Sequence, residues 1–136
     1  MDAGRIPMSI LLVEDEPHLR RALARSLASR GYAVDEAASR GEAVRAALAR
    51  PPTLMLLDIN LPDASGWDVL RDLAEQGRST PTVIMSAAPP NPSRVREFAP
   101  FGVLTKPFPL DALLRFIRRL EPDAPAPTPA WLLDEG

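Results

Sequence analysis

Apolar residues along the chain form two patterns that alternate. Short apolar runs without polar alternation are typical of parallel strands that helices cover on both faces. Segments with apolar residues three or four positions apart are typical of amphipathic helices. The predicted strands are residues 8–13, 32–37, 54–57, 82–85 and 103–105. Helical patterns follow these strands, so strand and helix alternate five times along the chain.

The first predicted helix shows how these boundaries are recognised. Pro17 suits a first helical turn, and Leu19, Leu23 and Leu27 then recur at a spacing of four, with Gly31 as a stop. Later helices have similar signals. Ser39 is a predicted N-cap, residues 67–77 and 110–120 have helical spacing, and Pro51 and Pro52 end the second helix.

The fourth helical segment is the weakest. Pro89, Pro90, Pro92 and Pro100 leave at most residues 93–99 for a helix, because proline removes a backbone donor and restricts the residue before it. The sequence therefore predicts a shortened or irregular fourth helix, or a loop.

Alternating strands and helices predict an α/β fold, a doubly wound parallel sheet with right-handed crossovers. We expect one domain over residues 8–120, preceded by an extension at 1–7. Residues 121–136 form a Pro/Ala-rich tail that is predicted to be extended. Within that tail, Trp131–Leu133 could bind a partner, fold back on the domain or stay disordered.

Charge and composition exclude several classes of function. The 136 residues carry a formal net charge of -2, which gives no electrostatic reason to expect direct binding to nucleic acid or to an anionic membrane. The chain has no cysteine, so disulfides and thiolate zinc sites are excluded, and no apolar run approaches the length of a membrane span. We expect a cytoplasmic protein. Among the basic residues Lys106 is the only lysine, which draws attention to its position.

Polar residues end four of the predicted strands. Glu14 and Asp15 follow the first strand, Asp58 follows the third, Ser86 the fourth and Lys106 the fifth. In open α/β sheets ligands bind beyond the carboxyl ends of the strands. We therefore expect these five residues to converge at one edge of the sheet.

The converging residues suit phosphoryl transfer. Three carboxylates would repel one another unless a hard cation lies among them, and oxygen ligands with room for water suit Mg²⁺. Asp58 beside a metal ion, the Lys106 ammonium and the Ser86 hydroxyl is arranged for nucleophilic attack on phosphorus. Taken alone, Asp58 could be a turn residue and Ser86 could simply bond to the backbone.

Four motifs carry a resemblance to a known family. In order they are ILLVEDEP (10–17), LMLLDINLPDASG (54–66), VIMSA (83–87) and LTKPF (104–108). Together the motifs resemble the receiver domains of bacterial two-component response regulators, over residues 9 to about 120. The resemblance implies a CheY-like, flavodoxin-like (βα)5 fold with strand order 2-1-3-4-5.

The resemblance also implies roles for individual residues. Asp58 would be the phosphoacceptor, and Asp15, Asp58 and the Asn60 backbone carbonyl would bind Mg²⁺, with Glu14 acting through water. Lys106 and Ser86 would contact the phosphoryl group. The Lys106–Pro107 bond would be cis.

Three positions tune or alter the family pattern. Asn60 and Ala88 flank the pocket and would influence how fast the phosphate is hydrolysed. Val103 occupies a position that is usually aromatic in the family and that reports phosphorylation to the output face, so the resemblance does not carry over the usual coupling between the hydroxyl and an aromatic side chain. The interrupted fourth helix argues against transferring the family's common dimer, although a homodimer is left open.

The sequence is compatible with three functions. The first is a phosphorylatable switch that receives from a sensor histidine kinase or a phosphotransfer protein, signals to another protein and catalyses only its own phosphorylation and dephosphorylation. The second is an adaptor that works without phosphorylation. The third is a haloacid-dehalogenase-type phosphohydrolase. It is disfavoured because such enzymes have a D-x-D arrangement on the first strand, whereas here Asp58 and Asn60 form D-x-N on the third strand. The sequence leaves open whether the chain is a stand-alone regulator or a fragment.

Overall fold

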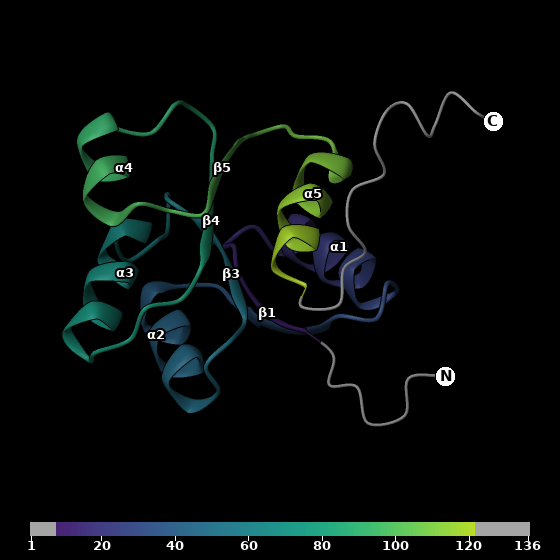
Figure 1. The fold of residues 1–136 in the computed structure, drawn as a ribbon, viewed down its shortest axis with the longest axis horizontal. Coiled ribbons are helices and arrows are strands. Elements are labelled where there is room, and N and C mark those ends of the chain that lie inside the picture. The colour runs from purple at the N-terminus through teal and green to yellow at the C-terminus, as the bar shows by residue number, and fades with distance from the viewer. Residues whose placement is uncertain (1–7, 122–136) are drawn as a thin grey trace.

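Parallel strands and helices alternate along residues 8–121, the part of the chain that the computed structural model describes (Figure 1). The strands are β1 (Ser9–Val13), β2 (Ala33–Ala37), β3 (Leu54–Asp58), β4 (Thr82–Ser86) and β5 (Gly102–Thr105). The helices are α1 (Pro17–Ala28), α2 (Arg40–Ala49), α3 (Gly66–Glu75), α4 (Pro92–Phe98) and α5 (Leu110–Leu120). The extension at 1–7 and the tail from residue 122, with Trp131–Leu133, lie outside the described residues.

The five strands form one parallel sheet in the order β2-β1-β3-β4-β5. Its register pairs Val13 with Leu57 and Ser86 with Thr105, so the carboxyl ends of these strands lie at the same edge. Both the α/β prediction and the strand order are confirmed. The three central strands are almost completely buried, as their unbroken apolar runs predicted.

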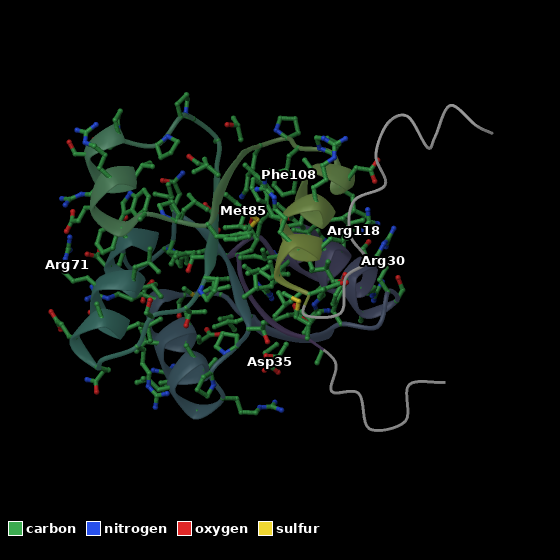
Figure 2. All side chains as sticks on the ribbon, viewed as in Figure 1. Arg30, Asp35, Arg71, Met85, Phe108 and Arg118 are labelled. Carbon is green, nitrogen blue, oxygen red and sulfur yellow. The ribbon has the colours of Figure 1, made fainter. Side chains whose placement is uncertain are left out.

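Helices cover both faces of the sheet. Figure 1 shows α1 and α5 on one face and α2, α3 and α4 on the other. Alternate strand residues therefore feed two apolar layers: Leu12 and Leu56 belong to the α1/α5 layer, and Leu11 and Leu57 to the opposite one. Figure 2 marks Met85, a fully buried residue of the α1/α5 layer.

Side chains placed just before the helices fix where they begin. Ser39 accepts a hydrogen bond from the Glu42 backbone N–H at α2, as predicted. Ser65 and Asp68 form a capping box at α3. The first amides of a helix have no partner within the helix, and these caps supply acceptors for some of them.

The fourth helix exists but is short, which agrees with the prediction, and it begins one residue earlier than the predicted limit. Proline is tolerated at a first helical position, so Pro92 belongs to α4, and the Asn91 side chain caps it by accepting from the Ser93 N–H. The helix has no buried residue and ends at Phe98, followed by the C-cap Ala99, which has a left-handed backbone with φ 45°.

Other boundaries differ from the predictions by one or two residues. The first two strands begin at Ser9 and Ala33 rather than at 8 and 32, β4 includes Ser86, β5 begins at Gly102, and α3 ends at Glu75 rather than at Gly77. None of the helices within residues 8–121 combines the length and the apolar composition that crossing a membrane requires.

Candidate functional site

The first strand delivers Glu14 and Asp15 to the carboxyl edge of the sheet. The Glu14 N–H donates to the Ala37 carbonyl at 3.0 Å, which extends the contact between β1 and β2 beyond Val13. The Glu14 side chain is 1% exposed, whereas Asp15 is exposed to solvent. The first acidic residue therefore lies inside the site, and the second lies at its opening.

The third strand ends at Asp58, whose carboxyl group is held from two sides. Asp58 is 3% exposed. Its Oδ1 accepts the Asn60 backbone N–H at 2.9 Å, and its Oδ2 accepts the Lys106 ammonium at 2.8 Å. Burial together with these two donors gives the carboxylate a fixed orientation.

Lys106 comes from the end of β5 and reaches both buried carboxylates. Its Nζ donates to Glu14 Oε1 at 2.5 Å as well as to Asp58 Oδ2. The Lys106 N–H donates to the Ser86 carbonyl at 2.7 Å, and the Lys106–Pro107 bond is cis, as the resemblance implied. The only lysine of the chain thus lies in the acidic cluster.

Charge and burial shift two pKa values in this cluster. Burial raises the pKa of Glu14 to about 7, and the neighbouring Asp58 carboxyl adds to the rise while Lys106 opposes it. Burial acts to lower the pKa of Lys106, but its hydrogen bonds to Asp58 and Glu14 outweigh that effect, so the pKa is raised. Lys106 therefore stays an ammonium ion.

The three acidic residues have the donor set of a hard divalent cation. Glu14, Asp15 and Asp58 each offer a carboxylate oxygen, and these oxygens all lie within 4.8 Å of one another. Oxygen-only ligands with one exposed member that leaves room for water fit Mg²⁺. The residues present therefore fit the metal ion that the sequence predicted.

Ser86 lies at the same edge, but its hydroxyl points elsewhere. Ser86 Oγ donates to the Ala88 carbonyl at 2.5 Å and accepts the Ala88 N–H at 3.3 Å. Ser86 is thus brought to the site without contacting Asp58, and its hydroxyl makes the backbone contact that the sequence left open. Ala88 is exposed, and Val103 is half-buried against the α2/α3/α4 layer.

With this geometry in place, comparison with known proteins identifies the family. Residues 10–118 match the model of the response regulator receiver domain. The chain belongs to this family. Receiver domains bind Mg²⁺ at an acidic cluster and generally signal rather than catalyse, so the family assignment decides against the phosphohydrolase alternative.

The relatives of this receiver domain are regulators of about twice its length. It is 37% identical over 111 residues to the transcriptional regulatory protein KdpE of Mycobacterium tuberculosis, covering 80% of this chain and 49% of KdpE. It is 35% identical over 132 residues to the transcriptional regulatory protein TcrA of the same species, covering 95% of this chain and 52% of TcrA. The chain spans about half the length of the curated relatives it matches.

Solved receiver structures have the same fold. The response regulator TrrA of Thermotoga maritima, crystallised in complex with Mg²⁺-BeF, has 27% identity and a TM-score of 0.74 over 84% of this chain and 99% of TrrA. The chemotaxis protein CheY4 of Vibrio cholerae has 24% identity and a TM-score of 0.77, covering 85% of this chain and all of CheY4. This second likeness concerns the fold alone.

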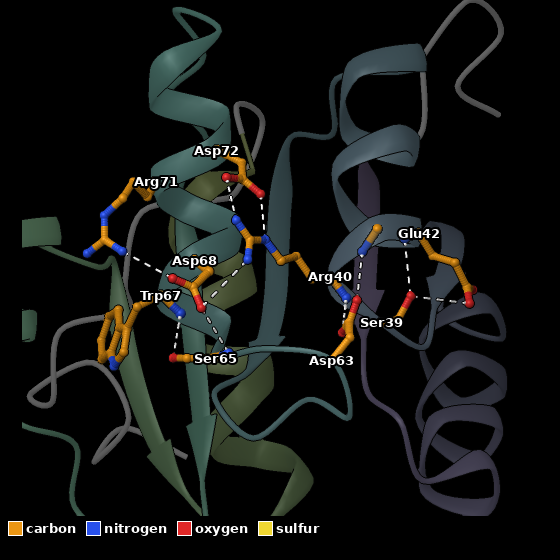
Figure 3. Close-up of polar contacts among 10 residues, drawn as sticks. Ser39, Arg40, Glu42, Asp63, Ser65, Trp67, Asp68, Arg71 and Asp72 are labelled. Carbon is orange, nitrogen blue, oxygen red and sulfur yellow. Dashed lines mark hydrogen bonds and ion pairs between the residues drawn. The ribbon is translucent and has the colours of Figure 1, made fainter.

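Sequence reasoning missed two residues around the receiver's acidic cluster. Gly66 ends the motif LMLLDINLPDASG without an assigned role, yet a Cβ at this position would lie 2.6 Å from the Asp58 carbonyl oxygen. Asp63 lies in the same motif and likewise had no assigned role, but its carboxylate accepts backbone N–H groups of α2 (Figure 3). A glycine directly after the helix cap Ser65 was a usable signal for the first, whereas nothing local indicated the second.

Proposed function

We propose that this receiver domain is a phosphorylatable signalling switch and that Asp58 is its phosphoacceptor. The observation that carries the proposal is the contact of the Lys106 ammonium with Asp58 Oδ2 at 2.8 Å, inside a group that also contains Glu14 and Asp15. A buried carboxylate held beside an ammonium can receive a phosphoryl group whose negative charge would be compensated by that ammonium and by a cation bound to the two further acidic side chains.

In the proposed reaction an Asp58 carboxylate oxygen attacks the phosphorus of the donor. A P–O bond to Asp58 forms, the bond between phosphorus and the leaving group breaks, and the leaving group keeps that electron pair. Lys106 would pair with a phosphoryl oxygen. Asp15, Asp58 and the Asn60 carbonyl would hold Mg²⁺, with Glu14 acting through water, and the ion would neutralise charge on the phosphoryl oxygens.

The remaining pocket residues would tune the phosphorylated state. To donate to the phosphoryl group, Ser86 would have to give up its hydrogen bond to the Ala88 carbonyl. Asn60 and Ala88 would set how readily water reaches the acyl phosphate. Ala88 has no side-chain acid or base, so any hydrolysis would depend on water and on the groups already named.

Receiver domains of this family interact with histidine kinases or phosphotransfer proteins, and such a protein is the proposed donor. The domain would in turn signal by contact with a downstream protein. The proposal places both exchanges in the cytoplasm, and the domain itself would catalyse only its own phosphorylation and dephosphorylation.

The test uses the full chain with Mg²⁺ and acetyl phosphate, followed by intact mass. Wild type should gain one phosphoryl group, and the gain should disappear with EDTA and in Asp58→Asn. Asp111→Asn is the matched control, because Asp111 is exposed in the first turn of α5. An unmodified wild type, or an Asp58→Asn protein that is phosphorylated like wild type, would contradict the proposal.

A second candidate function is an adaptor that needs no phosphorylation. It is favoured by the Ser86 hydroxyl, which bonds to Ala88 rather than facing Asp58, and by Val103 in place of an aromatic side chain. The adaptor would accept no phosphoryl group in the mass experiment, or would accept one with no change in shape or partner. Backbone amide NMR spectra recorded with and without acetyl phosphate separate the two functions. A switch should show shifted amide signals beyond the phosphorylation site, and an adaptor should not.

A further inference from the structure

The loop between β3 and α3, residues 59–65, carries the backbone that would face the metal ion. Backbone bonds close its base: the Ile59 N–H donates to the Met85 carbonyl at 3.1 Å, and the Gly66 N–H donates to the Ile59 carbonyl at 2.7 Å. Asn60 and Ser65 form an isolated antiparallel bridge just above. These contacts fix the ends of the loop, and the Leu61 N–H donates to the Ala64 carbonyl at 3.2 Å across its tip.

Asp63 fastens that tip to another element. Its Oδ1 accepts the Arg40 backbone N–H at 2.8 Å, and its Oδ2 accepts the Gly41 backbone N–H at 3.3 Å (Figure 3). Arg40 and Gly41 are the first two residues of α2, whose amides have no partner within the helix. The loop therefore supplies part of the cap of α2.

The charge of Asp63 strengthens this contact. A carboxylate at a helix N-terminus is favoured by the helix dipole and makes charge-assisted hydrogen bonds with the backbone. The bond from the Arg40 backbone holds the pKa of Asp63 below its usual range. Ser39 accepts the next amide, that of Glu42, so the two acceptors from different segments together satisfy three amides of the first turn.

The helix that receives Asp63 is itself tied to α3. The Arg40 guanidinium forms a two-pronged contact with Asp72 of α3, at 2.7 Å and 2.9 Å (Figure 3). The backbone of Arg40 thus holds the loop, and its side chain holds the helix that the loop enters. Asp63 is the member of this network that belongs to the 59–65 loop.

We infer that Asp63 is a positioning residue for the phosphoacceptor site. By fixing the loop tip on α2 it keeps the Asn60 backbone beside Asp58, where the Asn60 N–H already donates to Asp58 Oδ1. The inference rests on the proposed function, in which the Asn60 carbonyl binds Mg²⁺. Partners that orient a metal ligand from outside commonly change metal affinity by about 10-fold to 100-fold when they are lost.

The experiment is a Mg²⁺ titration of the full chain, followed by amide chemical shifts. Asp63→Ala should bind Mg²⁺ about 10-fold more weakly than wild type, and the amides of the 59–65 loop should exchange faster. Because Asp63 is exposed, the alanine leaves no cavity in the core. Asp63→Asn should restore most of the affinity, since its amide oxygen can accept one of the two backbone bonds.

Asp72→Ala is the matched control, because it removes a carboxylate from the same network while leaving the loop tip on α2. Urea unfolding of both variants shows what each substitution costs the fold. Unchanged Mg²⁺ affinity in Asp63→Ala, or an equal loss of affinity in both variants, would overturn the inference alone. A wild type that neither binds Mg²⁺ nor accepts a phosphoryl group would overturn the proposed function and this inference with it.

Discussion

Replacing Gly66 with alanine tests how closely the start of α3 approaches the phosphoacceptor strand. An added Cβ would lie 2.6 Å from the Asp58 carbonyl oxygen and 2.9 Å from the Ile59 Cα. Ordinary contacts of a Cβ begin at 3.4 Å, so the shorter distance falls short by about 0.8 Å. Both opposing atoms belong to the backbone of β3 and the residue after it, and no side chain can turn away to make room.

The cost follows from what has to move. Separating the two segments would strain or break the 2.7 Å bond from the Gly66 N–H to the Ile59 carbonyl. A lost backbone bond costs about 1 kcal/mol, and overpacking costs about 1–3 kcal/mol. We expect Gly66→Ala to lower the free energy of unfolding by about 2–3 kcal/mol, and the melting temperature by about 10 °C for a domain of this size.

Gly41→Ala is the matched control. Gly41 is also in the first turn of a helix, and its added Cβ would meet only the end of the flexible Arg45 side chain, at 3.2 Å. Alanine gains about 0.5–1 kcal/mol over glycine inside a helix, so this variant should be as stable as wild type or more so. Urea unfolding followed by circular dichroism measures both, and a Gly66→Ala protein as stable as Gly41→Ala would refute the close-approach argument.

Three further outcomes are expected. In EDTA, wild type should lose stability relative to Glu14→Gln as pH rises from about 4.5 to about 7, by up to about 3 kcal/mol. The raised pKa of Glu14 means that the folded state holds this proton more tightly than the unfolded state, so deprotonation destabilises the fold; a difference that does not vary with pH contradicts this. Mg²⁺ at ten times its dissociation constant should raise the free energy of unfolding by about 1.4 kcal/mol, and a melting temperature that Mg²⁺ leaves unchanged counts against the site. Phe98→Ala removes a ring stacked on Trp67 at 5.6 Å and should speed amide exchange across α4, which has no buried residue, at a global cost of about 1 kcal/mol; unaltered exchange would show that the stack does not hold α4.

Much of the fold could be predicted because the apolar runs and the helical segments between them indicate the same architecture. Unbroken apolar runs such as Leu54–Leu57 specify buried parallel strands, and parallel strands require crossovers that place helices on both faces. The errors lie at the ends of elements. Proline is excluded from a helix interior but not from the first turn, so a proline by itself does not mark where a helix begins. Pro92 could therefore not be assigned to α4 without knowing that the Asn91 side chain caps the helix.

The sequence could predict those site residues whose position depends only on where a strand ends. Glu14, Asp58 and Lys106 could be brought together in advance because the carboxyl ends of parallel strands share one edge. The direction of the Ser86 hydroxyl depends on the path of the backbone after β4, which no pattern of residue types encodes. The contact of Asp63 with α2 joins segments more than twenty residues apart and depends on the packing of two helices.

The net charge of the acidic cluster links proton and metal binding, and gives a last prediction. With Glu14, Asp15 and Asp58 ionised, the Lys106 ammonium leaves a net charge of about -2, which a divalent cation balances. Without metal, a proton on Glu14 relieves part of that charge, consistent with its pKa of about 7. If Mg²⁺ binds only the deprotonated cluster, its apparent dissociation constant should be about 10-fold larger at pH 6 than at pH 8. Titrating Mg²⁺ at both pH values measures the ratio, and Glu14→Gln should reduce it toward one. Equal affinities at the two pH values, or a ratio that survives in Glu14→Gln, would show that Glu14 is not the group that competes with the metal ion.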